Sequence, residues 1–152
     1  MGWNSKMKKN TKKLLLQLDS SNSYKTQEKA MEQLKSERDL NIFILPGEPF
    51  SKGTWENCAK ILYMKTDNEL LPYVEKLMDW LEDMNWPGAW IILERLSLMP
   101  KEFIKKAYFE KRKIAYKEIE KVGEDYLNSW YSNLEMIFFP EKIKLYSPKK
   151  QK

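Results

Sequence analysis

The chain has 152 residues, of which 42% are hydrophobic and 32% are charged, and its net charge is +5 at pH 7. This length is that of one domain with a buried core, and 6 Trp, 8 Tyr and 6 Phe exclude a disordered chain. Only 5 glycines accompany many Lys, Glu, Leu and Met residues, which favours helices over a sheet, so we expect a single all-α domain spanning residues 1–152.

The first third of the chain is predicted to form two short helices. The segment NTKKLLLQL gives a helix at residues 10–18, and a polar turn separates it from a second helix that runs to Leu34. Ser23 or Thr26 is the candidate N-cap, because a hydroxyl oxygen accepts from a free N–H group of the first turn. The following NIFIL is compatible with a short strand or with buried loop packing, and we expect the loop because no partner strand is evident.

The middle third is predicted to contain a helix at Trp55–Tyr63 and a second helix that starts at a capping box of Thr66 and Glu69. Pro72 is expected to kink this second helix or to delay its start. Helical spacing gives it an apolar stripe, formed by Leu70, Val74, Leu77, Met78 and Leu81. We expect this stripe to pack antiparallel against the next helix, whose apolar residues are Ala89, Ile92, Leu93 and Leu96.

The last third carries apolar residues from Ile104 to Ile137 at spacings of three, four or seven. This pattern predicts one long helix or two helices broken near Gly123, and Pro140 ends it. The basic ends of the chain, about residues 1–9 and 147–152, are expected to be mobile.

Two segments resemble each other. Residues 14–34 and 77–96 each begin with Leu-x-x-x-Leu, continue through an acidic or polar turn, and reach Glu-x-Leu in a following helix. Such self-similarity predicts a short stack of antiparallel helical hairpins resembling HEAT-type repeats.

The stretch DMNWPGAW, residues 83–90, is interpreted as an elbow between two helices. We expect Pro87 at the first helical position, with Asp83 and Asn85 placed to cap the helix. Gly88 would then permit another backbone to approach closely. The alternative is an acidic and aromatic recognition surface for a protein partner, formed by Asp79, Glu82, Asp83, Trp86 and Trp90.

The same region carries a family resemblance. LMDWLEDMNWPGAWIILERL, residues 77–96, resembles an uncharacterised bacterial family, domain of unknown function 5071, in which a Leu-rich helix runs into Trp-Leu-x-Asp-Met-Asn-Trp-Pro and a second helix. The resemblance implies a small helical fold and a bacterial source, and it implies no particular activity.

The sequence gives little support for histidine-based catalysis, a metal site, a cysteine nucleophile or nucleotide binding. The chain has no histidine, which removes the usual general base and the commonest metal ligand. Cys58 stands alone and is expected to be a buried helix residue, and no Gly-rich phosphate loop occurs. Asp79, Glu82 and Asp83 lie within one helical turn, as acid catalysis or a divalent cation would require, but we favour a solvated helix face.

Basic residues form three groups, and the middle group is the candidate nucleic-acid surface: Lys105, Lys106, Lys111, Arg112 and Lys113. Tyr108, Tyr116 and Trp3 could stack on bases. Interleaved glutamates such as Glu110 and Glu118 favour ordinary ion pairs along a helix instead. Nucleic-acid binding is therefore the second hypothesis.

The leading hypothesis is a non-catalytic module that binds another protein, such as a bacterial accessory or toxin-neutralising protein, without cofactor, metal or small-molecule substrate. Abundant Trp, Tyr and Met favour an interface, and stacked hairpins create a concave face. The single cysteine and the lack of a long apolar segment predict a cytoplasmic protein outside the membrane. An enzyme that uses the carboxylates near Asp83 is the third hypothesis.

Overall fold

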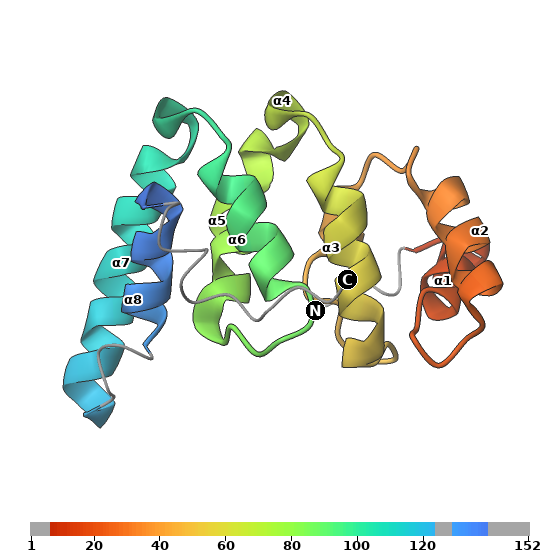
Figure 1. Cartoon of the computed structure of the whole chain (residues 1–152), viewed down its shortest axis with the longest axis horizontal. Coiled ribbons are helices and arrows are strands. Elements are labelled where there is room, and N and C mark those ends of the chain that lie inside the picture. Colours follow the sequence, from red (N-terminus) through yellow and green to blue (C-terminus); the bar gives the residue numbers. More distant parts are fainter. Residues whose placement is uncertain (1–6, 124–128, 140–152) are drawn as a thin grey trace.

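The computed structural model describes residues 7–123 and 129–139. Every regular element in these ranges is helical, so the predicted all-α class is confirmed. Figure 1 shows the helices side by side in a row, with α1 and α2 at one end and α7 and α8 at the other. The two ends that we expect to be mobile, about 1–9 and 147–152, lie outside the described residues except for residues 7–9.

The N-terminal helices are α1, Lys9–Gln17, and α2, Tyr24–Leu34. Ser23 is the N-cap of α2, since its Oγ accepts from the backbone N–H of Thr26 at 3.1 Å. The NIFIL segment forms a short 3₁₀ helix, η2, at Leu40–Phe43, and Ile42 and Phe43 are buried. The expectation of buried loop packing in place of a strand is therefore confirmed.

The middle of the chain follows its local signals closely. A 3₁₀ turn, η3 at Lys52–Thr54, leads into α3 at Trp55–Tyr63. The predicted capping box of Thr66 and Glu69 starts α4 at Asp67–Leu70. Pro72 then interrupts the α-helix, giving η4 at Leu71–Tyr73, α5 at Val74–Asp79 and η5 at Trp80–Glu82. All five residues of the predicted apolar stripe are buried.

The stripe packs against the next helix, as expected, through both α5 and η5, but that helix is not its only neighbour. The next helix, α6 at Ala89–Ser97, runs antiparallel to α5 but packs most extensively against α3, whereas α5 packs most extensively against α7. The reason is that α6 is apolar over most of its circumference. It therefore lies between neighbours, in the middle of the row, and does not pair with α5 alone.

The C-terminal part consists of two helices, so the two-helix form of the prediction is correct. The long helix α7, Lys101–Val122, ends at Gly123, whose φ of 67° is left-handed. After the undescribed residues 124–128 come α8 at Trp130–Glu135 and η7 at Met136–Phe138. The helix α7 packs between α5 and α8.

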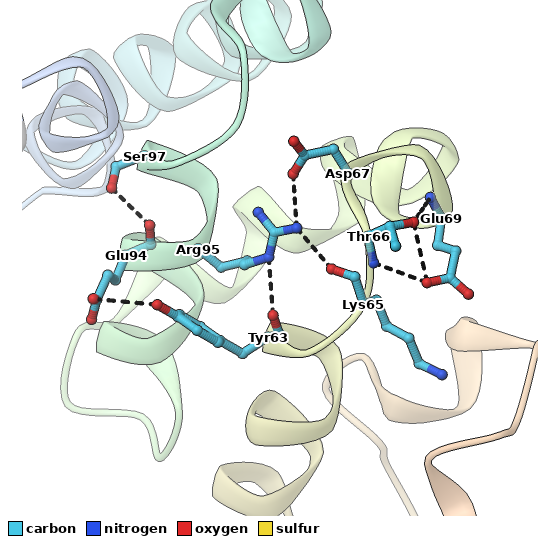
Figure 2. A network of polar contacts seen from close by, with 8 residues as sticks. All are labelled: Tyr63, Lys65, Thr66, Asp67, Glu69, Glu94, Arg95 and Ser97. Atoms are coloured by element: carbon cyan, nitrogen blue, oxygen red, sulfur yellow. Dashed lines mark hydrogen bonds and ion pairs between the residues drawn. The ribbon is translucent and has the colours of Figure 1, made fainter.

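Side chains from neighbouring elements bind the free carbonyl groups at helix C-termini. Arg95 of α6 donates from Nε to the Tyr63 carbonyl at 3.1 Å and from Nη2 to the Lys65 carbonyl at 2.7 Å, and it pairs with Asp67 at 2.7 Å (Figure 2). Lys65 in turn donates from Nζ to the carbonyls of Lys35 and Glu37, at 2.6 and 3.2 Å, after the end of α2. Two buried cations thus join α2, α3 and α6 through backbone carbonyls at helix C-termini.

Two asparagine side chains also donate to backbone carbonyls, at Leu18 and Leu81, which occupy matching positions of the two similar segments. Asn57 donates to the Leu18 carbonyl at 2.8 Å, and Asn133 donates to the Leu81 carbonyl at 2.7 Å. Leu18 and Leu81 close the two Leu-x-x-x-Leu segments. The two acceptors match across the repeat, but the donors lie 39 and 52 residues away along the chain, so the internal repeat and the comparison with HEAT-type repeats both stay predictions.

Because Arg95 binds two backbone carbonyls and Asp67, its substitution should lower the stability of the protein strongly. Arg95→Met removes the donor of the buried Lys65 carbonyl, the partly buried Tyr63 carbonyl and Asp67, while an apolar side chain still fills the space. We expect a loss of about 2–4 kcal/mol in the free energy of unfolding, measured by urea denaturation. Lys60→Met is the matched control, because Lys60 forms only an exposed pair with Glu56 at 3.6 Å and should change stability by less than about 1 kcal/mol. Equal losses in the two variants would contradict the role assigned to Arg95.

Candidate functional site

The stretch 83–90 is an elbow, as predicted, but its geometry differs from the expected one. The helix α6 begins at Ala89, and Gly88 is its N-cap with a φ of 88°. The Ala89 N–H donates to the Trp86 carbonyl at 3.1 Å, so Pro87 and Gly88 occupy the two central positions of a turn. These are the positions that proline and glycine favour in a type II turn. The prediction that Pro87 is the first helical residue is therefore wrong.

The expected side-chain cap of α6 is also absent. Asp83 accepts the Asn85 backbone N–H at 2.8 Å through Oδ1, and no side chain caps the start of α6. Asp83 therefore stabilises the preceding turn, in which the Trp86 N–H donates to the Asp83 carbonyl at 3.0 Å.

Gly88 allows the close approach that the sequence predicts. A Cβ atom at this position would lie 2.8 Å from the Ala59 Cβ and 3.1 Å from the Trp55 carbonyl oxygen. Both contacts are with α3, so the start of α6 lies directly against that helix. A side chain other than hydrogen would separate the two helices.

Tryptophan residues pack this joint. Trp80 is fully buried and donates from Nε1 to the Pro87 carbonyl at 2.9 Å. The Trp55 ring lies edge-to-face with those of Trp80 and Trp86, at centroid distances of 6.1 and 5.5 Å. Trp86 and Trp90 are half-buried against the core. These contacts favour a structural role for the Trp residues.

The residues predicted to form a protein-binding surface at the elbow do not all contact the same part of the molecule. Asp79 pairs with Lys111 of α7 at 2.8 Å, whereas Trp86 packs on Trp55 of α3. These two helices lie on opposite sides of the α5–α6 pair (Figure 1). Glu82 is exposed, and partial desolvation, followed by the charge of Asp79, raises the pKa of its carboxyl above the ordinary value.

Cys58 lies inside α3 and is completely buried. Burial raises the pKa of its thiol well above the ordinary value, because the thiolate would lose its hydration. The thiol is therefore a small apolar core group, as expected from its isolation in the sequence.

The basic residues of α7 divide into two sets. Lys111 is only 16% exposed and pairs with Asp79, and Arg112 donates from Nε and Nη2 to the Tyr131 hydroxyl at 2.9 and 2.6 Å. Lys105, Lys106 and Lys113 are exposed. Three of the five nucleic-acid candidates thus face solvent, and two hold α7 against its neighbours.

A groove that the sequence analysis did not identify lies between α7 and α8. Two hollows, of about 540 and 440 Å³, share Phe109 and Arg112. We call them together the α7–α8 groove, and its lining residues are Lys101, Lys105, Tyr108, Phe109, Arg112, Lys113, Tyr116, Lys117, Glu120, Tyr131, Glu135, Phe138 and Phe139. Phe109, Arg112, Lys113, Tyr116 and Glu120 recur at three or four residues along α7, which is the signal that could have indicated a shared face.

Aromatic rings and cationic side chains pack against one another along this groove. The Arg112 guanidinium lies 4.9 Å from the centre of the Tyr131 ring and 5.7 Å from that of Tyr108. The Tyr108 ring packs at 4.4 Å on Phe138, and the Lys101 Nζ lies 5.0 Å over the Phe138 ring. Cation–π and edge-to-face contacts of this kind fix side chains in place.

Residues 49–109 match the model of a family described as Domain of unknown function (DUF5071). The resemblance expected from residues 77–96 is thereby confirmed, and the match spans α3 to α6 together with the first part of α7. It includes the elbow and Arg95, whereas the α8 side of the groove lies beyond it. No curated protein and no solved structure matches the chain significantly.

No helix in the described part of the chain has the length and apolar character needed to cross a membrane. Those same residues also contain no cluster of three or more Asp, Glu or Cys side chains that could hold a metal ion.

Two glycines provide a direct test of the elbow. Both Gly88 and Gly123 have positive φ, but a Cβ at Gly123 would meet no atom within 4 Å. Gly123→Ala should therefore cost only backbone strain, about 1–2 kcal/mol. Gly88→Ala adds a collision with α3 and should therefore lower the free energy of unfolding by more than Gly123→Ala does, as measured by urea denaturation. A similar loss in both variants would show that α6 does not press on α3 at Gly88.

Trp86→Ala distinguishes packing from recognition at the elbow. Because Trp86 is half-buried on Trp55, we expect the variant to lose about 1–3 kcal/mol of stability, seen as a lower melting temperature by circular dichroism. Trp90→Ala should behave similarly. An unchanged melting temperature together with loss of a partner protein would instead support the surface of Asp79, Glu82, Asp83, Trp86 and Trp90.

Proposed function

We propose that the chain is a non-catalytic module that binds another protein, and that the α7–α8 groove is its contact surface. The supporting observation is the exposure of large aromatic side chains in one groove: Phe109 is 44%, Tyr116 49% and Phe139 44% exposed. Water-exposed aromatic groups gathered on one surface are typical of protein interfaces, where aromatic residues and arginine are enriched.

The rigidity of the groove supports the same function. Arg112 bridges α7 and α8 through two hydrogen bonds to the Tyr131 hydroxyl, and the Tyr116 and Tyr131 rings pack at 5.6 Å. Side chains that are already fixed lose little conformational entropy when a partner binds. The groove is therefore organised before the partner arrives.

In this proposal the protein acts in the bacterial cytoplasm as an accessory protein, for example one that neutralises a toxin. The bacterial setting follows from the family resemblance, and the single cysteine is compatible with a reducing compartment.

Nucleic-acid binding is the second candidate, and the exposed side chains of Lys105, Lys106 and Lys113 on α7 favour it. If phosphate contacts provide the affinity, it should fall steeply with salt. Charge reversal at these three lysines should then weaken binding about uniformly across sequences. Affinity that depends on neither salt nor these charges would eliminate this candidate.

A tagged pull-down tests the protein-binding function. Partner protein that is recovered in stoichiometric amount should survive nuclease, and Phe109→Ser with Tyr116→Ser should reduce its recovery at least about tenfold, as expected for loss of interface anchors. Tyr24→Ser is the matched control, because Tyr24 is 75% exposed on α2 at the other end of the row.

All variants should remain folded at the temperature of the pull-down, as checked by circular dichroism, since each altered ring is about half exposed or more. Recovery of nucleic acid alone, released by salt, would contradict the proposal. Equal loss of partner in the Tyr24→Ser control would remove the groove as the contact surface.

A further inference from the structure

The charge of the α7–α8 groove restricts the kind of partner that fits. Five of its lining residues are cationic, Lys101, Lys105, Arg112, Lys113 and Lys117, whereas two are acidic, Glu120 and Glu135. Lys105 and Lys117 have no ion pair within the described residues. The rim is therefore positive and complements a negatively charged ligand.

The floor of the groove is aromatic. Phe109 belongs to both hollows, with Tyr116 on one side of it and Phe139 on the other. Each of these rings is between 44% and 49% exposed. A ligand that fits must therefore bring apolar groups as well as negative charge.

Three other rings of the groove, those of Tyr108, Tyr131 and Phe138, are poorly placed for stacking on bases. The Arg112 guanidinium already lies over the Tyr131 ring, and the Lys101 ammonium lies over the Phe138 ring. The Tyr108 ring meets Phe138 edge-to-face. Single-stranded nucleic acid needs open ring faces for its bases, so these contacts favour inserted protein side chains instead.

We infer that the α7–α8 groove binds an acidic segment of a partner protein, in which carboxylates meet the lysine rim and apolar side chains enter the two hollows on either side of Phe109. This inference rests on the proposed protein-binding function and specifies the partner's chemistry. The chain's own residues 140–152 carry five lysines and one glutamate, so charge disfavours them as the occupant.

The test uses a fluorescein-labelled short peptide of alternating glutamate and leucine or phenylalanine, its counterpart with lysine in place of glutamate, and a single-stranded oligonucleotide. Binding to the full chain is measured by fluorescence anisotropy. We expect the acidic peptide to bind and the lysine peptide not to bind. Phe109→Ser should weaken binding of the acidic peptide at least about tenfold, and Lys105→Glu with Lys117→Glu should have a similar effect.

The control carries the same charge change elsewhere. Lys25→Glu with Lys29→Glu alters two exposed lysines of α2, at the far end of the row, and should leave affinity for the acidic peptide unchanged. Equal weakening in the control would overturn the inference, because attraction would then reflect only net charge. Oligonucleotide binding that depends on Phe109 more strongly than peptide binding does would also overturn it.

The results of the pull-down and of the peptide measurement together distinguish failure of the acidic-partner inference from failure of the proposed protein-binding function. If Phe109→Ser abolishes recovery of a partner protein but the acidic peptide binds no better than its lysine counterpart, the groove binds protein and the acidic chemistry is wrong. If no protein is recovered with the wild-type chain, the proposed function itself fails.

Discussion

Arg95 provides the contact on which the middle of the molecule depends. Its guanidinium binds the Tyr63 and Lys65 carbonyls and the Asp67 carboxylate, so that one side chain of α6 fixes the end of α3 and the start of α4 (Figure 2). Helix C-termini leave carbonyl groups without partners, and burying them would cost free energy unless a donor is supplied. Neighbouring helices supply these donors here, which explains how short helices interrupted by 3₁₀ turns can form one ordered row.

The same arrangement explains why the groove lies at α7 and α8. A helix pair at the end of a row is covered on one side only, and its outer surface must either be polar or meet a partner. Here α7 packs on α5, while its other side carries Phe109 and Tyr116 among lysines. A polar end would need no aromatic groups. Their presence, with Arg112 holding α8 in place through Tyr131, is the physical basis of the proposed binding function.

Local signals in the sequence predicted local structure well. Thr66 and Glu69 form the expected capping box, and Ser23 caps α2, because both depend on residues only three positions apart. The sequence also predicts the elbow, but Pro87 and Gly88 form a turn there, so proline does not occupy the first helical position of α6. Neither the α3–α6 contact nor the groove could be predicted in the same way. Arg112 and Tyr131 come together only through tertiary packing, and helical spacing does not say which neighbour an apolar face meets.

A photo-crosslinking amino acid at position 116 tests the central claim, that the α7–α8 groove is a protein-binding surface, most directly. The matched sample carries the same amino acid at position 24, on the exposed surface of α2. Irradiation in source cells, followed by nuclease treatment and mass spectrometry, should give a defined protein adduct from position 116, joined through an acidic segment, and none from position 24. Adducts of equal yield from both positions, or a nucleic-acid adduct from position 116, would contradict the claim.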